Sequence, residues 1–458
     1  MTAASAPNVV AALGGARRAR IEVRGVVQGV GFRPFVYRLA HELALAGWVN
    51  NDGAGVIIEV EGAPASIDSM TRRLGEDAPP LARIDSIAVR DCAPRVERGF
   101  SIVESAGGIS RTAIGPDSAI CSGCLAELFD PGDRRYRYAF INCTNCGPRY
   151  TITRSLPYDR ATTSMARFQQ CRECAAEYLA PPHRRFHAEP NACPRCGPRL
   201  ALVDATGVEI LAADTIAETV GRLLRGEIIA IKGLGGFHLA CDARNQGAVA
   251  RLRARKARDE KPFAVMALNV ASLSSLARVT DGEHALLESP ERPIVLLRKQ
   301  ERVDACLPGV APGLAWIGAM LPYTPLHYML FHEAAARPDG VAWLEAAQEL
   351  LVVMTSANPG GEPLVIDNDE AIRRLSGIAD ALLIHDRAIV TRCDDSVLRA
   401  STDRAAGGFQ FMRRARGYTP RAIKLPRSGP PIVALGGYFK NAICVTRGDE
   451  AFVSQHIG

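Results

Sequence analysis

The chain has 458 residues, of which 47 % are hydrophobic and 23 % are charged, and its net charge is +6. This length predicts about three domains, and the composition is that of a globular protein. The small net charge does not indicate a nucleic-acid-binding protein, and no apolar run is long enough to span a bilayer. Arg17, Arg18 and Arg20 follow the mildly apolar N-terminal run, which is not the pattern of a signal peptide. We therefore expect a cytoplasmic protein.

Residues 19–106 have the element pattern of a small α+β domain. Strands are predicted at residues 20–27, 48–51, 56–61, 84–90 and 100–104, and helices at residues 35–46 and 67–74. A turn at residues 51–55 joins the second and third strands into a hairpin. The order βαββαβ is that of the ferredoxin-like split unit.

A glycine-rich loop lies between the first predicted strand and the first predicted helix. It consists of Gln28, Gly29, Val30, Gly31 and Phe32. Backbone N–H groups of such a loop and the positive end of the helix dipole form a cradle for an anion, and Arg33 could clamp a phosphate through two parallel N–H bonds. Taken alone, the loop is better explained as a tight turn.

The whole string at residues 23–33, together with residues 47–51, resembles the signature of the acylphosphatase family. The resemblance implies that the loop of Gln28 to Phe32 binds the phosphate and that Arg33 holds it. It also implies that Asn51 orients the attacking water. Both catalytic positions of the family are present.

Eight of the thirteen cysteines form four CxxC pairs within residues 109–200, namely Cys121/Cys124, Cys143/Cys146, Cys171/Cys174 and Cys193/Cys196. The spacing C-x2-C-x18-C-x2-C occurs twice and predicts two structural zinc sites with four thiolates each. Disulfides and a redox or iron–sulfur role are the alternatives, which a cytosolic chain disfavours. The spacing leaves open whether each repeat binds its own zinc or the pairs interleave. Five scattered cysteines are expected in the core: Cys92, Cys241, Cys306, Cys393 and Cys444.

The charge of this cysteine-rich region argues against nucleic acid as a partner. Residues 109–200 contain thirteen arginines, no lysine and eight acidic residues. With eight thiolates and two Zn²⁺ ions the net charge is about +1, far below the basic footprint of a nucleic-acid reader. We expect a structural spacer or a docking platform.

Residues 208–425 read as an α/β domain. Helices are predicted at residues 216–224 and 248–255, and strands at residues 227–232, 262–267, 294–298, 351–355 and 381–385. Polar groups recur at the ends of these strands, where ligand sites form. The residues concerned are Lys232, His238, Lys256, Arg258, Lys261, Ser356, Asn358, Arg387 and Arg392. Taken one at a time, these residues have simpler explanations. The cations could lie on a solvated helix face, Ser356 and Asn358 could form an ordinary turn, and His238, like His327, could be a histidine of the core.

Together these polar groups resemble the YrdC family. The resemblance implies that the KxR pair of Lys256 and Arg258 and the SxN group of Ser356 and Asn358 bind ATP, with Mg²⁺, and a carbamoyl-type adenylate. The other residues of the set are expected around the same ligand, with the cations neutralising the triphosphate charge.

The order of the three modules resembles the HypF family, the carbamoyltransferases of nickel–iron hydrogenase maturation. Residues 185–198 and 413–418 look like that family as well. Residues 431–458 resemble the opening of the carbamoyl-transfer domain that follows in it, a relative of the tRNA threonylcarbamoyltransferases. About 300 further residues would be expected for that domain. We therefore expect a fragment, whose truncation at Gly458 is natural or engineered.

The resemblance implies a relay. Carbamoyl phosphate is hydrolysed to carbamate, ATP converts the carbamate to carbamoyl adenylate, and the intact protein transfers the carbamoyl group to the C-terminal cysteine of its partner HypE. A tRNA threonylcarbamoyl-adenylate synthase of the YrdC type and a non-enzymatic zinc-bridged adaptor are the alternatives, and neither explains the acylphosphatase module. The sequence leaves open the oligomeric state and the hydrogenase that is served.

Overall fold

The computed structural model describes residues 16–52, 55–103, 114–156, 158–358, 362–401, 408–437 and 441–457. The chain divides into two compact units. The first comprises residues 1–115 and 176–188, and the second comprises residues 116–175 and 189–458. Several predicted features lie outside the described residues: the middle of the hairpin turn at 53–54, the strand end at 104, the boundaries at 106 and 109, and residues 359–361, 438–440 and 458 of the later motifs.

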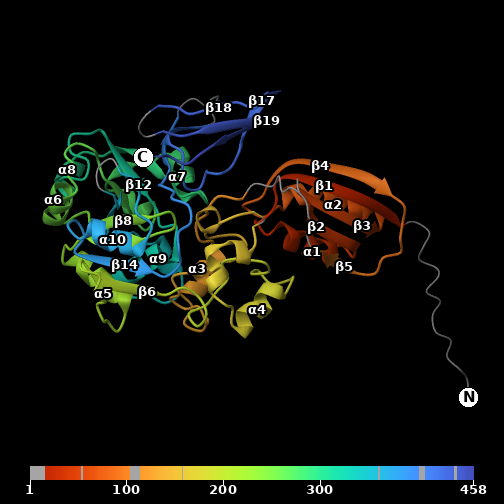
Figure 1. The fold of residues 1–458 in the computed structure, drawn as a ribbon, viewed down its shortest axis with the longest axis horizontal. Helices are drawn as coiled ribbons and strands as arrows, with labels where there is room; N and C mark the ends of the chain where they lie inside the picture. The colour runs from red at the N-terminus through yellow and green to blue at the C-terminus, as the bar shows by residue number, and fades with distance from the viewer. Residues whose placement is uncertain are drawn as a thin grey trace, which may run out of the picture. The chain divides into compact units, whose positions relative to one another are not determined.

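The first unit is built on one sheet (Figure 1), and its elements are β1 (Arg17–Val26), α1 (Phe32–Glu42), β2 (Ala46–Asp52), β3 (Gly55–Gly62), α2 (Pro64–Glu76), β4 (Arg83–Cys92) and β5 (Phe100–Ile102). The strand order is β4-β1-β3-β2-β5, with only β5 parallel to its neighbour. This confirms the predicted ferredoxin-like arrangement. Alternate residues of β1, namely Ala19, Ile21 and Val23, share a buried core with the apolar faces of α1 and α2.

Helix α1 differs from its predicted span of residues 35–46. It begins three residues earlier because Gly31 takes a left-handed conformation, with φ of 76°, and caps the helix directly. It ends at Glu42, and Ala44 with φ of 52° turns the chain into β2. The earlier start places the glycine-rich loop against the first turn of the helix.

The cysteine-rich region has little regular structure. Its elements are α3 (Ser122–Leu128), the 3-10 turns η2 (Tyr150–Ile152), η3 (Arg160–Thr162) and η4 (Ser164–Arg167), and α4 (Arg172–Leu179). In each repeat the first cysteine of the leading pair, Cys121 or Cys171, immediately precedes a short helix. The repeat in the sequence is therefore also a repeat in local structure.

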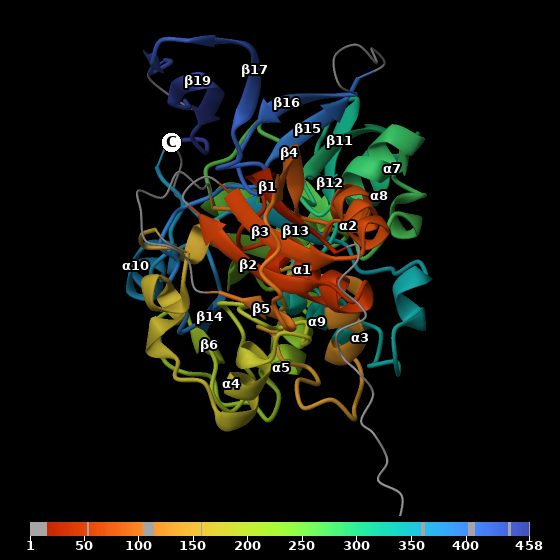
Figure 2. The same cartoon turned by 90° about the vertical axis from the view of Figure 1, so that its right-hand side faces the viewer.

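The remainder of the second unit forms a large mixed sheet with helices (Figure 2). Its elements are β6 (Leu200–Asp204), α5 (Thr215–Leu224), β7 (Ile229–Lys232), β8 (Phe237–Asp242), α6 (Gln246–Arg255), β9 (Ala264–Met266), η5 (Ala271–Leu273), β10 (Ala277–Arg278), α7 (Asp281–Glu288), β11 (Ile294–Lys299), α8 (Val303–Cys306), β12 (Trp316–Met320), α9 (Pro325–Ala334), η6 (Ala342–Glu345), β13 (Val352–Ser356), α10 (Asn368–Leu375), β14 (Ala381–His385), β15 (Val397–Ala400) and β16 (Phe409–Arg413). The strand order is β16-β15-β11-β12-β9-β13-β8-β7-β14-β6, and β10 pairs with β11.

The two faces of this sheet carry separate cores. In β7, Ile229 and Ile231 enter a core shared with α5, α9 and the cysteine-rich region, whereas Ala230 enters a core shared with α6, α7 and α10. The cysteine-rich region thus completes one layer of an α/β arrangement. The predicted strands are confirmed. The turn between β7 and β8 consists of residues 233–236, because Lys232 ends β7 and Phe237 begins β8.

The last described elements form a small separate sheet, with β17 (Ile423–Gly429), β18 (Val433–Ala434) and β19 (Cys444–Val453) in the order β17-β19-β18. Ile432, Val433 and Leu435 are each more than half exposed. These strands do not bury a core of their own, as their length predicts. Within the described residues, none of the helices is both long and apolar enough to cross a membrane.

Candidate functional site

The glycine-rich loop of the first unit leads directly into the first turn of α1. Gly29 and Gly31 have φ values of 68° and 76°, a left-handed conformation that strains any residue with a Cβ. Gly31 is the N-cap residue of α1, and the first turn of that helix contains no acidic residue. The loop therefore combines turned backbone with the positive end of a helix dipole, as an anion cradle requires.

A side chain ties this loop to the hairpin that carries Asn51. The Gln28 amide donates hydrogen bonds to the carbonyl oxygens of Asp52 (2.9 Å) and Gly55 (2.7 Å). Asn51 lies in β2, and its buried Oδ1 has no hydrogen-bond partner among the described residues. Arg33 is the second residue of α1 and is half-buried. An unpaired buried amide oxygen can accept a hydrogen bond from a water or a substrate.

The eight paired cysteines form two clusters, and each cluster consists of one sequence repeat. One comprises Cys121, Cys124, Cys143 and Cys146, and the other Cys171, Cys174, Cys193 and Cys196. Neighbouring sulfurs are 3.6–3.8 Å apart in both. Four thiolates at about 2.3 Å from a tetrahedral zinc ion would be separated by about 3.8 Å, so the geometry fits zinc. A disulfide would require about 2.05 Å. The structure answers the open question of pairing, because the repeats do not interleave.

Two arginines that the sequence analysis did not single out surround the second cluster. Arg134 donates to Cys174 Sγ from both terminal nitrogens, at 3.4 and 3.3 Å, and Arg135 donates to the same sulfur at 3.5 Å. Arg135 is 1 % exposed and also donates to Asn191 Oδ1 and the Ala192 carbonyl. Positive charge at this sulfur favours the thiolate form that binds metal. Among the five scattered cysteines, Cys241 and Cys393 are buried as expected, and Cys92 and Cys444 are half-buried. Cys306 is exposed, so the expectation of a core position was wrong for it, because α8 lies at the surface.

The KxR and SxN groups of the second unit meet one another. Lys256 follows α6, and its Nζ donates to the carbonyl oxygens of Ser356 and Asn358 (both 2.7 Å) and to Asn358 Oδ1 (3.2 Å). Ser356 Oγ donates to the same Oδ1 at 2.8 Å. Burial, with Arg258 and Lys261 nearby, lowers the pKa of Lys256 to about 7. Lys256 therefore organises the turn after β13.

Beside this turn lies a cavity of about 200 Å³, which gathers residues that are far apart in the sequence. Its charged and polar lining consists of His238, Arg258, Lys261, Thr355, Ser356, Asp394, Asp395 and Arg413. Burial lowers the pKa of Arg258 to about 10, which leaves the guanidinium charged at neutral pH. Four of the predicted ligand residues are thus brought together: His238, Arg258, Lys261 and Ser356. Arg392 instead donates to the Leu364 carbonyl at 2.8 Å.

A buried ionic chain supports one wall of this cavity. His238 Nε2 lies 2.8 Å from Asp395 Oδ2, and Arg416 Nε donates to Asp395 Oδ1 at 2.7 Å. Arg416 is 1 % exposed and stacks over Tyr323 at 3.5 Å. Arg416 and His238 hold the pKa of Asp395 far below its usual value, against the effect of burial. Asp394, Asp395, Arg413 and Arg416 are not among the ligand residues predicted from the sequence.

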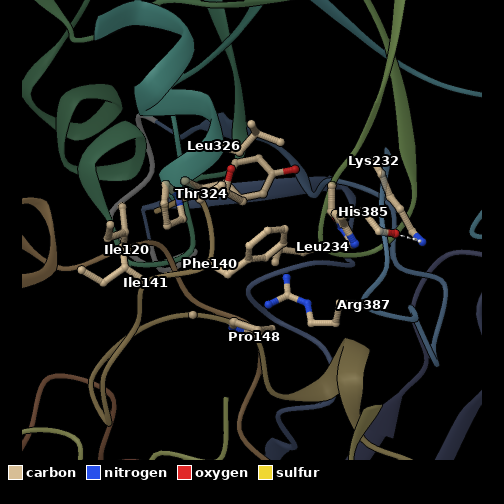
Figure 3. Close-up of a pocket in the computed structure, with 15 residues that line it drawn as sticks. Ile120, Phe140, Ile141, Pro148, Lys232, Leu234, Thr324, Leu326, His385 and Arg387 are labelled. Atoms are coloured by element: carbon tan, nitrogen blue, oxygen red, sulfur yellow. Dashed lines mark hydrogen bonds between the residues drawn. The ribbon is translucent and has the colours of Figure 1, made fainter. Parts of the chain in front are cut away.

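Two predicted ligand residues, Lys232 and Arg387, line a different and smaller cavity of about 30 Å³ (Figure 3). Lys232 Nζ donates to Asn368 Oδ1 (2.6 Å) and to the His385 carbonyl (3.0 Å). Burial lowers the pKa of Lys232 to about 8. The assignment of these two residues to ATP stays a prediction.

Four family profiles match successive parts of the chain. They are described as acylphosphatase (residues 19–102), HypF finger (120–153 and 171–203), telomere recombination, the profile that includes YrdC (222–415), and HypF Kae1-like domain (427–458). The matches follow one another in the order that the modules have in the sequence.

Relatives match nearly the whole chain. The carbamoyltransferase HypF2 of Cupriavidus necator is 68 % identical over 444 residues, which are 96 % of this chain and 55 % of that protein. The carbamoyltransferase HypF of Rhizobium leguminosarum is 54 % identical over 96 % of this chain and 55 % of its own length. The crystal structure of full-length HypF in the phosphate- and nucleotide-bound form superposes with a TM-score of 0.86, at 44 % identity, over 97 % of this chain and 56 % of that one. The chain spans about half the length of the relatives that it matches.

Proposed function

This chain belongs to the HypF family, and we propose that it converts carbamoyl phosphate to carbamoyl adenylate in two steps. The observation that carries the proposal is the cavity that assembles Arg258, Lys261 and Ser356 in a chain that also has the acylphosphatase loop. One module supplies a phosphate cradle, and the other supplies cations for a triphosphate. A single small metabolite, carbamoyl phosphate, connects the two chemistries.

The first step takes place at the glycine-rich loop. Loop N–H groups and Arg33 hold the phosphate, and Asn51 Oδ1 accepts a hydrogen bond from the attacking water. Water attacks the phosphorus, the bond to the carbamoyl oxygen breaks, and phosphate and carbamate leave with the protons of the water on the phosphate. The unpaired Oδ1 of Asn51 supports this role.

The second step takes place at the cavity of about 200 Å³. A carbamate oxygen attacks the α-phosphorus of ATP, the bond between the α and β phosphates breaks, and pyrophosphate leaves with its Mg²⁺. Arg258 and Lys261 neutralise the triphosphate, while Lys256 fixes the turn of Ser356 and Asn358 against it.

The cysteine clusters are proposed to hold two structural zinc ions. The first cluster contributes Cys124, Cys143 and Cys146 to the core that also contains α5 and α9, and Cys196 of the second cluster packs against that core. The metal would therefore stabilise one layer of the second unit. In the whole protein, the carbamoyl group would pass to the C-terminal cysteine of HypE through the domain that begins near residue 427. We place the reaction in the cytoplasm, where thiolates stay reduced.

The test is the substrate requirement for pyrophosphate release. The chain is incubated with ATP, Mg²⁺ and either carbamoyl phosphate or bicarbonate with threonine. Pyrophosphate should appear with carbamoyl phosphate only. Release that instead requires threonine and bicarbonate would identify a threonylcarbamoyl-adenylate synthase and overturn the proposal, and no release with either would contradict both functions.

A further inference from the structure

The small cavity of the second unit is bounded by the cysteine-rich region on one side and by the α/β part on the other. Phe140, Ile141 and Pro148 come from the former, and Lys232, His385 and Arg387 come from the latter (Figure 3). Its volume of about 30 Å³ is enough for about two water molecules or one small ion. A nucleotide does not fit such a space.

The guanidinium of Arg387 is the unusual feature of this cavity. Arg387 is 6 % exposed, yet within the described part of the chain its side chain has no hydrogen bond or ion pair. The guanidinium stacks over the Phe140 ring, with Cζ 5.1 Å from the ring centroid. Figure 3 shows the guanidinium directed toward Phe140 and the centre of the lining residues. Buried arginines are normally paired, because five N–H donors and a charge are costly to leave unsatisfied.

The groups around Arg387 do not neutralise it directly. Burial lowers the pKa of Arg387, while Tyr138, Asp117 and Asp386 favour its charged form at longer range. Asp117 Oδ1 accepts from the Arg149 backbone and from Thr151, and Asp386 accepts from the Arg199 backbone. Asp117 Oδ2 has no hydrogen-bond partner among the described residues, but it forms no ion pair with Arg387. Lys232 adds a second cation to the cavity wall.

His385 is a neutral neighbour of these cations. Burial, Lys232 and Arg387 hold the pKa of His385 well below its usual value. Its buried Nδ1 has no hydrogen-bond partner among the described residues. The cavity wall thus carries positive charge and unused polar atoms, and an anion bound there would satisfy both.

We propose that this cavity binds a planar one-carbon oxyanion, either carbamate or bicarbonate, at the guanidinium of Arg387, with the charge of Lys232 on the same cavity wall. The two oxygens of such a carboxylate match the parallel N–H pair of a guanidinium, and four non-hydrogen atoms suit the volume. Phe140 and Leu234 exclude water around it. Lys232 and Arg387 then serve the small anion and not the nucleotide.

The position of the cavity gives this site a place in the reaction. Gly233 lines the small cavity and His238 lines the larger one, and a Cβ on Gly233 would lie 3.3 Å from His238 Nδ1. The two cavities therefore lie on either side of one short glycine-rich turn. This assignment rests on the proposed function: the anion held at Arg387 is the carbamate that is adenylated next. Binding alone changes no covalent bond.

The test measures binding of ¹³C-labelled sodium bicarbonate to the full chain by NMR line broadening, without ATP or carbamoyl phosphate. Arg387→Gln should weaken binding at least about tenfold, the loss of a charge-assisted bidentate pair. Arg244→Gln, at an exposed position that lines neither cavity, is the matched control and should bind bicarbonate as the parent does. Ala139→Val, which fills the cavity without changing its charge, should also weaken binding if Arg387→Gln fails to fold.

Two further arms identify the anion. Inorganic phosphate, a tetrahedral anion, should compete at least about tenfold less well than bicarbonate. A solution of ammonium bicarbonate contains carbamate at equilibrium. If its apparent affinity exceeds that of sodium bicarbonate, the site is assigned to carbamate. If the two affinities are equal, the site is assigned to planar carboxylates in general. The proposal would be overturned if the parent chain did not bind bicarbonate. It would also be overturned if Arg387→Gln and Ala139→Val both bound bicarbonate as tightly as the parent. Since no ATP is present, failure of the two-step function would be seen separately, in pyrophosphate release.

Discussion

On the proposed function, the glycine-rich loop of the first unit and the larger cavity of the second unit hold phosphate groups in two different ways. The loop uses neighbours in the chain: two left-handed glycines, a helix start and Arg33 within a few residues. The cavity uses residues spread from His238 to Arg413 on separate strands and turns. A local site depends on backbone conformation, whereas a dispersed site depends on the packing of the entire sheet.

The two regions also differ in what keeps them folded. The first unit has its own core of residues from β1, β3, α1 and α2. In the second unit, the core on one face of the sheet includes Cys124, Cys143 and Cys146 together with residues of α5, α9 and β7. The dispersed site should therefore be sensitive to metal loss, and the local loop should not.

The largest expected effect follows from removing one cysteine ligand. Cys143→Ser should lose about one zinc per chain and expose the core of the second unit, because a structural zinc contributes about 10 kcal/mol or more, comparable to the whole stability of a domain. Pyrophosphate release should vanish while phosphate release from carbamoyl phosphate persists. Metal analysis, calorimetric unfolding and the two product assays measure these changes.

Cys306→Ser, at an exposed cysteine outside both clusters, is the matched control and should keep about two zinc ions. A metal-free Cys143→Ser chain with parental unfolding behaviour would show that the clusters are not structural zinc sites.

A change confined to the loop should lower phosphate release without disturbing the fold. Arg33→Lys keeps the charge but loses the bidentate fork, so phosphate release should fall about 10²- to 10³-fold without a change in unfolding temperature. Arg38→Lys, one turn later on the exposed side of α1, should behave as the parent does. Phosphate release by Arg33→Lys at close to the parental rate would remove the loop from the mechanism.

Single changes in the dispersed site should be milder, because several groups share the triphosphate. Arg258→Gln and Ser356→Ala should each lower the rate of pyrophosphate release about 10- to 100-fold, the range of one hydrogen bond to a charged group. Phosphate release should stay parental in both, as should both activities of Arg244→Gln at an exposed turn. If both variants retained parental pyrophosphate release, the nucleotide would have to bind elsewhere.

The smallest expected effect is the uptake of a fraction of a proton when ATP binds. Because the pKa of Lys256 is lowered to about 7, its amine is mostly neutral at pH 8 and mostly charged at pH 6. A bound triphosphate favours the charged form and raises this pKa, so ATP binding should take up a fraction of a proton at pH 8 and little at pH 6. Titration calorimetry in two buffers of different ionisation enthalpy measures the uptake. Lys256→Met should abolish the uptake, and its persistence in this variant would assign the proton to another group.

The same contrast explains what the sequence could predict. The βαββαβ order, the loop with its glycines and the two four-cysteine repeats are local patterns, and the structure has the order, the left-handed glycines and the sequential clusters. The meeting of Lys256 with Ser356 came only from the family resemblance. Asp395 and Arg416 were missed as a site because their pairing depends on two chain segments that pack together. The separation of Arg387 from the larger cavity arises from sheet geometry, which residue spacing does not encode.

The central claim is that the carbon of carbamoyl phosphate becomes the carbonyl carbon of an adenylate. The chain is given ¹³C-carbamoyl phosphate, unlabelled bicarbonate, ATP and Mg²⁺, and the nucleotide products are analysed by mass spectrometry after rapid quenching. The account predicts carbamoyl adenylate that carries the heavy carbon, formed much more slowly in the Arg33→Lys and Arg258→Gln reactions. An adenylate that contains only the light carbon of bicarbonate, or heavy adenylate formed at the parental rate by Arg33→Lys, would contradict it.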